Sequence, residues 1–254
     1  MILFILVLLG IIQGNDKHSN VASAVYNWST LDVKRQETRE TRPILEGTTT
    51  HLEYFEIHAT TLHAGKMPHS KHTHEHEDEL VLVREGKLKI ISENTEKIIG
   101  PGGIALMMPG EVHGMENVGD TPATYYILKF KSKAPMNINR SKTAGGSMVL
   151  DRTDLEFKAH DKGGRWNYFD RPTASCDDFE MHATRLNAGV NSHPPHTHVQ
   201  EEIILMLEGN ANMHIDGKEY ATAVGDVIFL DSMVPHGITN TGDEACEYFA
   251  FQWK

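Results

Sequence analysis

The sequence predicts an all-β protein built from two similar barrels or sandwiches in tandem. The chain consists of short segments that are either apolar or alternate between apolar and polar residues, and glycines separate these segments. The whole pattern occurs twice at a nearly constant offset. Its 254 residues, of which 39% are hydrophobic, suffice for two domains with ordinary cores. We find no long stretch with the 3.6-residue apolar period of an amphipathic helix.

The individual strands are predicted by short apolar runs between glycine turns. Examples are residues 80–83, 87–91, 203–207 and 211–215, which are punctuated by Gly86, Gly102, Gly103, Gly209, Gly217 and Gly225. Many short strands at even spacing are typical of a barrel or a sandwich. The pair Asp216-Gly217 between two such runs indicates a tight hairpin.

The two copies align at an offset of 124 residues in their first part and 123 residues after it. Residues 55–65, read FEIHATTLHAG, match residues 179–189, read FEMHATRLNAG. One extra residue in the first copy then changes the offset, so that Glu79 matches Glu202 and His113 matches His236. The repeated unit is roughly 100 residues long, an ordinary size for a domain.

This repeat divides the chain into four expected segments. They are a signal-peptide and processing region at 1–24, an N-terminal domain at 25–131, a connector at 132–148 and a C-terminal domain at 149–254. The connector is polar and contains Gly145 and Gly146, which is typical of a domain boundary. A weaker likeness between residues 27–49 and 151–173 indicates that each unit begins with a lead-in segment.

The N-terminal region predicts export. Residues 2–12 carry no polar side chain, a run too short to span a bilayer as a helix but typical of the apolar part of a secretory signal. Cleavage after Gly14 or Ala24 would release a periplasmic or secreted protein without a stable membrane anchor. The alternative is a strand or helix buried in the fold.

The net charge limits the possible partners, and the cysteine content leaves two possibilities for the thiols. The formal net charge of −11 argues against binding to nucleic acid or to an anionic membrane, since both require a basic surface. The two cysteines, Cys176 and Cys246, either pair in an oxidising compartment or remain two buried thiols.

The second copy contains a pattern of metal-ligand residues. His196 and His198 stand two positions apart, so in an extended strand both imidazoles point to the same side. Glu202 follows four residues later, and His236 closes another apolar strand. Three imidazoles and one carboxylate suit a divalent transition metal. A histidine cluster without metal is the alternative in a chain with 16 histidines, but the arrangement occurs twice.

These residues carry a resemblance to a known family. Glycine, His-x-His, glutamate and glycine, followed by glycine, histidine and asparagine, resemble the two motifs of cupins, and both motifs occur in both copies. The chain over about residues 45–254 therefore resembles a bicupin, which implies two double-stranded β-helix (jelly-roll) barrels. It also implies two ligand sets: His196, His198, Glu202 and His236, and His72, His74, Glu79 and His113. The metal would be Mn, Fe, Ni, Co or Zn, which the ligands do not distinguish.

Cupins perform many reactions, so the resemblance leaves the reaction open. The chain is shorter than bicupin oxalate decarboxylases, and its ligand sets differ from the Glu-His-His-Gln set of bicupin ureidoglycine aminohydrolases. One hypothesis is a metal-dependent dioxygenase, isomerase, decarboxylase or hydrolase acting on a small carboxylate, keto, phenolic or sugar-acid substrate. The other is a non-catalytic binder of a small molecule or sugar with a structural metal. Either has a small-molecule partner and is compatible with a homo-oligomer.

Six residues are candidates for catalysis: His193, His69, His182, His58, Gln252 and Lys129. His193 and His69 precede the ligand pairs by three residues and are general bases, supports for the ligands or exposed loop residues. His182 and His58 repeat in the middle of a strand and either line a pocket or have their hydrogen bonds satisfied in the barrel wall. Gln252 and Lys129 occupy equivalent places on the final strands, so the two pockets would differ in charge.

The extra residue of the first copy bears on which site is better formed. It lies between His74 and Glu79, so a bulge or bend must restore the direction of that carboxylate. We therefore expect the second copy to hold the tighter and more active site.

Overall fold

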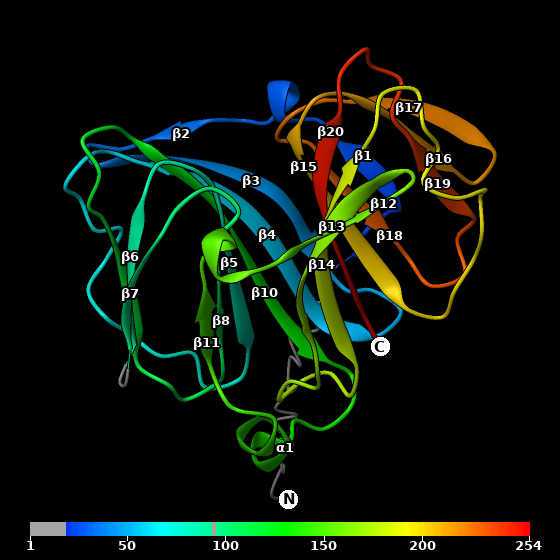
Figure 1. Cartoon of the computed structure of the whole chain (residues 1–254). Helices are drawn as coiled ribbons and strands as arrows, with labels where there is room; N and C mark the ends of the chain where they lie inside the picture. Colours follow the sequence, from blue (N-terminus) through cyan, green and yellow to red (C-terminus); the bar gives the residue numbers. More distant parts are fainter. Residues whose placement is uncertain (1–18, 93–94) are drawn as a thin grey trace, which may run out of the picture.

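A computed structural model describes residues 19–92 and 95–254 of the chain and contains two β-barrels side by side (Figure 1). Each barrel has one seven-stranded sheet facing one three-stranded sheet. The single α-helix of the described residues, α1 (Ile138–Thr143), lies in the connector between the two repeats. The predicted all-β fold of two jelly-roll barrels is confirmed.

The first barrel follows the first repeat. The order of its large sheet is β11 (Met148–Leu150), β8 (Ile104–Met107), β5 (Asp78–Glu85), β10 (Ala123–Ser132), β4 (Leu52–Leu62), β3 (Arg39–Gly47) and β2 (Lys34–Arg35). The order of its small sheet is β7 (Glu96–Ile99), β6 (Leu88–Ser92) and β9 (His113–Asn117). All of the pairings in both sheets are antiparallel.

The second barrel repeats this order. Its large sheet contains β1 (Ala24–Tyr26), β18 (Val227–Leu230), β15 (Glu201–Glu208), β20 (Cys246–Trp253), β14 (Phe179–Leu186), β13 (Gly163–Asp170) and β12 (Phe157–His160). Its small sheet contains β17 (Lys218–Thr222), β16 (Ala211–Ile215) and β19 (His236–Thr239). Short 3-10 turns, η1 (Trp28–Thr30) and η2 (Arg152–Asp154), follow β1 and β11 at equivalent places.

The two repeats exchange their first strands. Strand β1 precedes the first barrel in the chain but pairs with β18 of the second barrel, whereas β11 precedes the second barrel and pairs with β8 of the first. The expected division at residues 25 and 149 follows the repeat in the sequence, and the sheets cross it in both directions. Each barrel therefore needs a strand from the other repeat to complete its large sheet.

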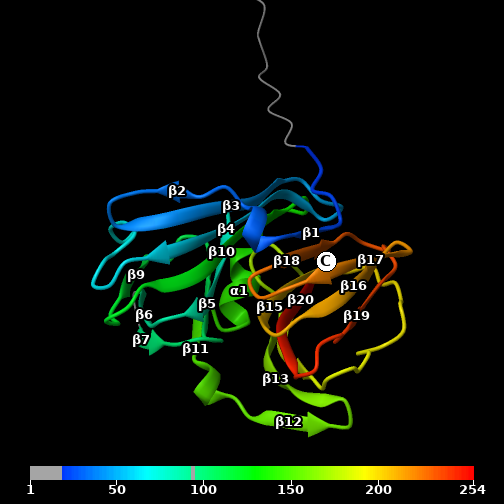
Figure 2. The same cartoon turned by 90° about the horizontal axis from the view of Figure 1, so that it is seen from above.

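One apolar core joins the two large sheets. It is formed by buried side chains of both repeats, and in it the ring of Phe55 packs 5.8 Å from Phe229 and 5.3 Å from Trp253, centre to centre. Two further cores fill the barrel interiors. Because burial of apolar surface is the main favourable contribution to folding, this joint core holds the barrels in one arrangement, which Figure 2 shows from above.

Two tyrosines, Tyr126 and Tyr168, each make a polar contact between the barrels. The Tyr126 hydroxyl donates to the carbonyl of Gly225 at 2.9 Å, and the Tyr168 hydroxyl donates to the carbonyl of Gly102. Both glycines have positive φ, +91° and +80° respectively. A Cβ at Gly225 would stand 2.5 Å from Nη1 of Arg84, so any larger residue at this position would displace the Arg84 side chain.

Both cysteines are free and buried. Cys176 lies in the core between the sheets and Cys246 in the interior of the second barrel, so the two thiols do not pair. Burial raises the pKa of both thiols, to about 11 for Cys246. Both are therefore protonated, unreactive core residues at neutral pH.

The apolar run 2–12 and the cleavage position after Gly14 lie outside the described residues. The alternative position after Ala24 lies inside them. Val21 is buried and its N–H donates to the carbonyl of Thr48 at 2.8 Å, while the Ser23 hydroxyl accepts from the N–H of Asp231 at 2.9 Å. None of the helices in the described part of the chain has the length and apolar character needed to cross a membrane.

These contacts predict that residues 19–24 contribute to stability. The free energy of unfolding should be about 2–4 kcal/mol lower for a protein that starts at Val25 than for one that starts at Asn15. The shorter protein loses a buried valine and at least five hydrogen bonds. Denaturant unfolding of the two proteins measures the difference. Val21→Ala in the longer protein should reproduce part of the loss. Equal unfolding midpoints for the two starts would show that these residues do not stabilise the fold.

Candidate metal centres

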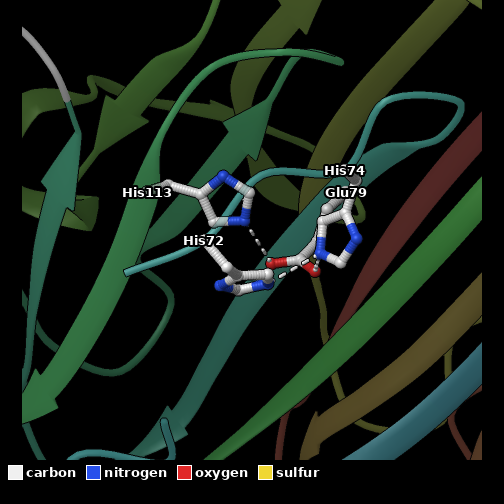
Figure 3. Close-up of side chains that lie close together, drawn as sticks. All are labelled: His72, His74, Glu79 and His113. Atoms are coloured by element: carbon white, nitrogen blue, oxygen red, sulfur yellow. Dashed lines mark hydrogen bonds and ion pairs between the residues drawn. The ribbon is translucent and has the colours of Figure 1, made fainter. Parts of the chain in front are cut away.

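Four side chains of the first barrel converge on one point (Figure 3). His72 and His74 come from the loop before β5, Glu79 from β5, and His113 is the first residue of β9. The loop is held to β9 by a two-residue bridge, in which the N–H of each of His72 and His113 donates to the other's carbonyl at 2.9 Å. The backbone therefore positions both imidazoles before any ligand binds.

The distances in this cluster are those of a set of metal ligands. His72 Nε2 lies 2.9 Å from His74 Nε2, His74 Nε2 lies 3.0 Å from Glu79 Oε2, and His113 Nε2 lies 3.5 Å from Glu79 Oε1. One ligand atom from each of the four residues falls within 4.8 Å of all the others. Such spacing leaves a common point that one ion can share.

The second barrel holds the equivalent group. His196 and His236 form the same backbone bridge, with both N–H to carbonyl distances at 3.0 Å. The ligand atoms of His196, His198 and His236 lie within 4.8 Å of one another. Glu202 Oε2 lies 3.3 Å from His198 Nε2 and 3.0 Å from His236 Nε2. The sequence-predicted residues of both sets are therefore brought together.

Backbone carbonyls set the tautomers of four of the imidazoles, and the longest of these contacts joins Nδ1 of His196 to the carbonyl of His236 at 3.3 Å. A carbonyl can only accept, so Nδ1 of His113 must donate to Glu111 at 2.9 Å, that of His198 to Gln200 at 2.8 Å, and that of His236 to Val234 at 2.8 Å. In the neutral rings Nε2 then carries the lone pair that a metal requires.

Two of these nitrogens have no other good partner. Nε2 of His113 and Nε2 of His236 are buried and form no well-directed hydrogen bond within the described residues, although each lies close to a carboxylate. Burying a polar atom without a hydrogen bond costs free energy, and a metal ion in each centre would give each of these nitrogens a partner. The residues present therefore fit a divalent metal at each centre.

The expectation that the second site is the tighter and more active one stays a prediction. The first site brings four ligand atoms within mutual reach, whereas in the second only the three imidazoles meet that criterion. The extra residue of the first copy is taken up in the loop before β5. The pairing of Glu79 with Met107 and Lys129 continues without a register shift at that point, so no bulge is needed.

The carboxylates that precede the ligands face the other way. Oδ2 of Asp78 accepts from the Thr173 hydroxyl at 2.9 Å, and Oε2 of Glu201 accepts from the Thr49 hydroxyl at 2.7 Å. Each pair joins one repeat to the other. Because successive residues of a strand alternate sides, these acids stabilise the contact between the barrels while the next residue faces the barrel interior.

The charges in the centres favour ionised carboxylates and neutral outer imidazoles. Burial acts to raise the pKa of Glu202, but the adjacent His198 and His236 outweigh it and lower the pKa to about 2. The pKa of Glu79 is likewise held well below its usual range by His113 and His74 despite its burial. Burial, followed by the charges of the neighbouring imidazoles, lowers the pKa of His72 to about 4. These are the protonation states that metal binding requires.

Each centre opens into a cavity that also contains the catalytic candidates. The first cavity, of about 190 Å³, is lined by His58, His69 and Lys129 together with His72 and Glu79. The second, of about 310 Å³, is lined at equivalent places by His182, His193 and Gln252, together with His196, Glu202 and His236. Lys129 and Gln252 thus face inward, and the two cavities differ in charge at this point.

The four candidate histidines are placed in two ways. His58 and His182 lie on the strand wall, where Nδ1 contacts Glu56 at 2.5 Å and Glu180 at 2.9 Å. The rings of His69 and His193 each stand edge-on to a ligand ring at 4.2 Å between centres. All four therefore reach the cavities.

Sequence reasoning missed several residues of the cavity walls. They are Arg39, Thr41 and Thr60 in the first cavity, and His160, Lys162, Arg165 and Thr184 in the second. Tyr125 and Tyr248 are almost fully buried but line the cavities as well. Strand alternation was the available signal, since Tyr125 and Lys129 share one face of β10.

The chain belongs to the cupin family. The model of the Cupin domain matches it twice, over residues 58–129 and 183–251, which lie one in each barrel and contain both ligand sets.

Solved structures share the whole two-barrel arrangement. Protein Ylba from E. coli is 16% identical, with 94% of this chain and 95% of that chain covered and a TM-score of 0.71. AerE from Microcystis aeruginosa is 16% identical, covering 88% and 97% at a TM-score of 0.68. The formate complex of Lactobacillus farciminis oxalate decarboxylase is 15% identical, covering 93% and 87% at a TM-score of 0.70. Identities this low establish the fold alone.

The separate clusters predict that each ion can be removed independently. His198→Ala should weaken metal binding at the second centre by more than about 10-fold and spare the first, and His74→Ala should do the reverse, because each change removes a ligand atom from one cluster only. Metal analysis after dialysis should fall from about two ions per chain to about one in either variant. Full metal content in both variants would mean that these histidines are not ligands.

Proposed function

We propose that this protein is a metal-dependent enzyme that acts on a small carboxylate. The observation that carries the proposal is the combination, in each barrel, of a His-and-Glu cluster with cationic side chains lining the same cavity. Arg39 and Lys129 accompany the first cluster, and Lys162 and Arg165 accompany the second. A negatively charged ligand fits such a cavity, since both the ion and the cations attract it.

The proposed ligands are His72, His74, Glu79 and His113 in the first barrel and His196, His198, Glu202 and His236 in the second. Four protein ligands leave positions free on an ion that accepts six, and the cavity lies beside them. A divalent metal in this place would act as a Lewis acid on a carbonyl or carboxylate, or lower the pKa of a bound water.

The chain's own groups orient the substrate and handle protons. Nδ1 of His69 donates to the carbonyl of Ser70 at 2.9 Å and that of His193 to the carbonyl of Pro194 at 3.2 Å. In the neutral rings Nε2 is then the basic atom, and in this role it accepts a proton from a substrate or water held next to the ligand cluster. The cations hold the carboxylate in place while this transfer occurs.

Likeness to a solved enzyme supports a carboxylate substrate. The Lactobacillus farciminis protein with the same two-barrel fold is an oxalate decarboxylase, and its structure contains formate. Both oxalate and formate are small carboxylates. The fold similarity does not select the reaction, and the proposal rests on the composition of the cavities.

Export is part of the proposal. The apolar run at residues 2–12 and the folded state of residues 19–24 favour cleavage after Gly14 over cleavage after Ala24. N-terminal sequencing of the protein recovered from its native host tests this. A mature chain that begins at Asn15 is expected, and an intact Met1 on a cytosolic protein would reject it.

Turnover after metal loading tests the enzymatic role. Protein stripped with a chelator and reloaded separately with Mn(II), Fe(II), Ni(II), Co(II) or Zn(II) should convert at least one member of a panel of 2-oxo acids, short dicarboxylates, phenols and uronates. Activity should disappear in the stripped protein and return with the metal, because the ion holds the reacting group.

The matched control is a variant with both His74→Ala and His198→Ala, which should bind little metal and show no turnover under any loading. Calorimetry distinguishes the alternative function. Metal-dependent binding of a panel member without turnover under any loading would identify a non-catalytic binder and reject the proposed enzyme.

A further inference from the structure

We infer that the two cavities select different ligands, and that Lys129 and Arg39 make the first cavity specific for a compact dianion. The second cavity accepts a longer ligand whose metal-bound group is anionic and whose group beside Gln252 is uncharged. The inference rests on the proposed function, because it assumes that one anionic group of the ligand binds at the metal cluster. It assigns the recognition of a second anionic group to named residues of the chain.

Lys129 stands next to the first cluster. It is directly opposite Glu79 in the antiparallel pairing of β10 with β5, so the two side chains share a face, with Cβ atoms about 5 Å apart. Lys129 lines the cavity and is close enough for its charge to act on His113. An anionic group beside the cluster would therefore meet the Lys129 ammonium.

Arg39 supplies a second cation in the same cavity. Its Nη1 donates to the carbonyl of Pro68, which anchors the guanidinium at the cavity wall. Its Nε is buried and has no hydrogen-bond partner within residues 19–92 and 95–254. A buried guanidinium donor without a partner is costly, and a carboxylate oxygen of a ligand would satisfy it.

The second cavity lacks both charges at the corresponding places. The 123-residue offset aligns Lys129 with Gln252, which stands opposite Glu202 in the pairing of β20 with β15. The 124-residue offset aligns Arg39 with Gly163, which has no side chain. At these two positions the second cavity is therefore neutral where the first carries two cations.

The cations of the second cavity stand at other positions of the cavity wall. Lys162 and Arg165 are exposed residues of the β12–β13 hairpin, at the edge of the large sheet. Nζ of Lys162 donates to the carbonyl of Ser192 at 2.7 Å, and Nε of Arg165 donates to the side chain of Asn167 at 2.6 Å. The second cavity is also the larger, at about 310 Å³ against about 190 Å³.

Desolvation turns this difference into specificity. A carboxylate that leaves water and finds no cation loses much more free energy than a neutral amide or hydroxyl. A dianion is thus disfavoured beside Gln252 and favoured beside Lys129. An uncharged group is favoured beside Gln252 and disfavoured beside Lys129, because such a group would leave the Lys129 ammonium without a partner.

Reciprocal exchange of the two residues tests this directly. His198→Ala protein retains the first centre alone and His74→Ala protein the second alone. Calorimetry with each metal-loaded protein compares malonate with its monoamide, malonamate, which has nearly the same shape and one charge fewer. The first centre should bind malonate about 10-fold or more tightly than malonamate, as expected for one charge-assisted contact. The second should discriminate by less than about 3-fold.

Lys129→Gln should remove the preference of the first centre, Lys129→Arg should keep it, and Gln252→Lys should introduce it at the second. Lys131→Gln is the matched control. It removes a lysine two residues along the same strand, which pairs with Glu53 and lies outside the cavity wall, and should leave the preference unchanged. Metal content and the unfolding midpoint, measured for every variant, confirm that each is folded and loaded.

The outcomes separate this inference from the proposed function. Equal affinities for malonate and malonamate at the first centre, unaltered by Lys129→Gln, would overturn the inference while leaving the enzyme proposal intact. Loss of all carboxylate binding and turnover in loaded protein would overturn both.

Discussion

The apolar core between the two large sheets is the constraint on which the rest of the structure depends. It contains residues of both repeats, so neither barrel can bury its large sheet alone. The exchange of β1 and β11 and the tyrosine contacts to Gly225 and Gly102 tie the same two sheets together at their edges. With the outer faces of the large sheets fixed against each other, the inner faces are left to form two cavities.

Inside each barrel the dominant cost is the burial of a carboxylate. Glu79 and Glu202 are almost fully buried, and only imidazoles come near enough to compensate them within the two clusters. An ionised acid in this position is tolerated when opposite charge is close, and a divalent ion supplies more of it than a protonated histidine does. This is the physical reason why we interpret both clusters as metal centres.

Much of this arrangement could be predicted from the sequence, because the ligand pattern is local and occurs twice. His196 and His198 share a side through strand alternation, and the offset transfers the whole set to the first copy. The strand exchange could not be predicted, since β1 and β11 are three residues long and their pairing is decided by distant chain. Arg39 was missed because its equivalent is Gly163, and the bulge considered for the first copy is not needed because the loop before β5 takes up the extra residue.

The most direct test of the account is the position of bound metal in a crystal of the protein grown with zinc. Anomalous diffraction should show two zinc peaks per chain, one in each barrel, at about 2.0–2.2 Å from the Nε2 atoms and the carboxylate oxygen of each proposed set. Zinc bound only at surface histidines such as His76 or His214, with neither cluster occupied, would contradict the assignment of both centres.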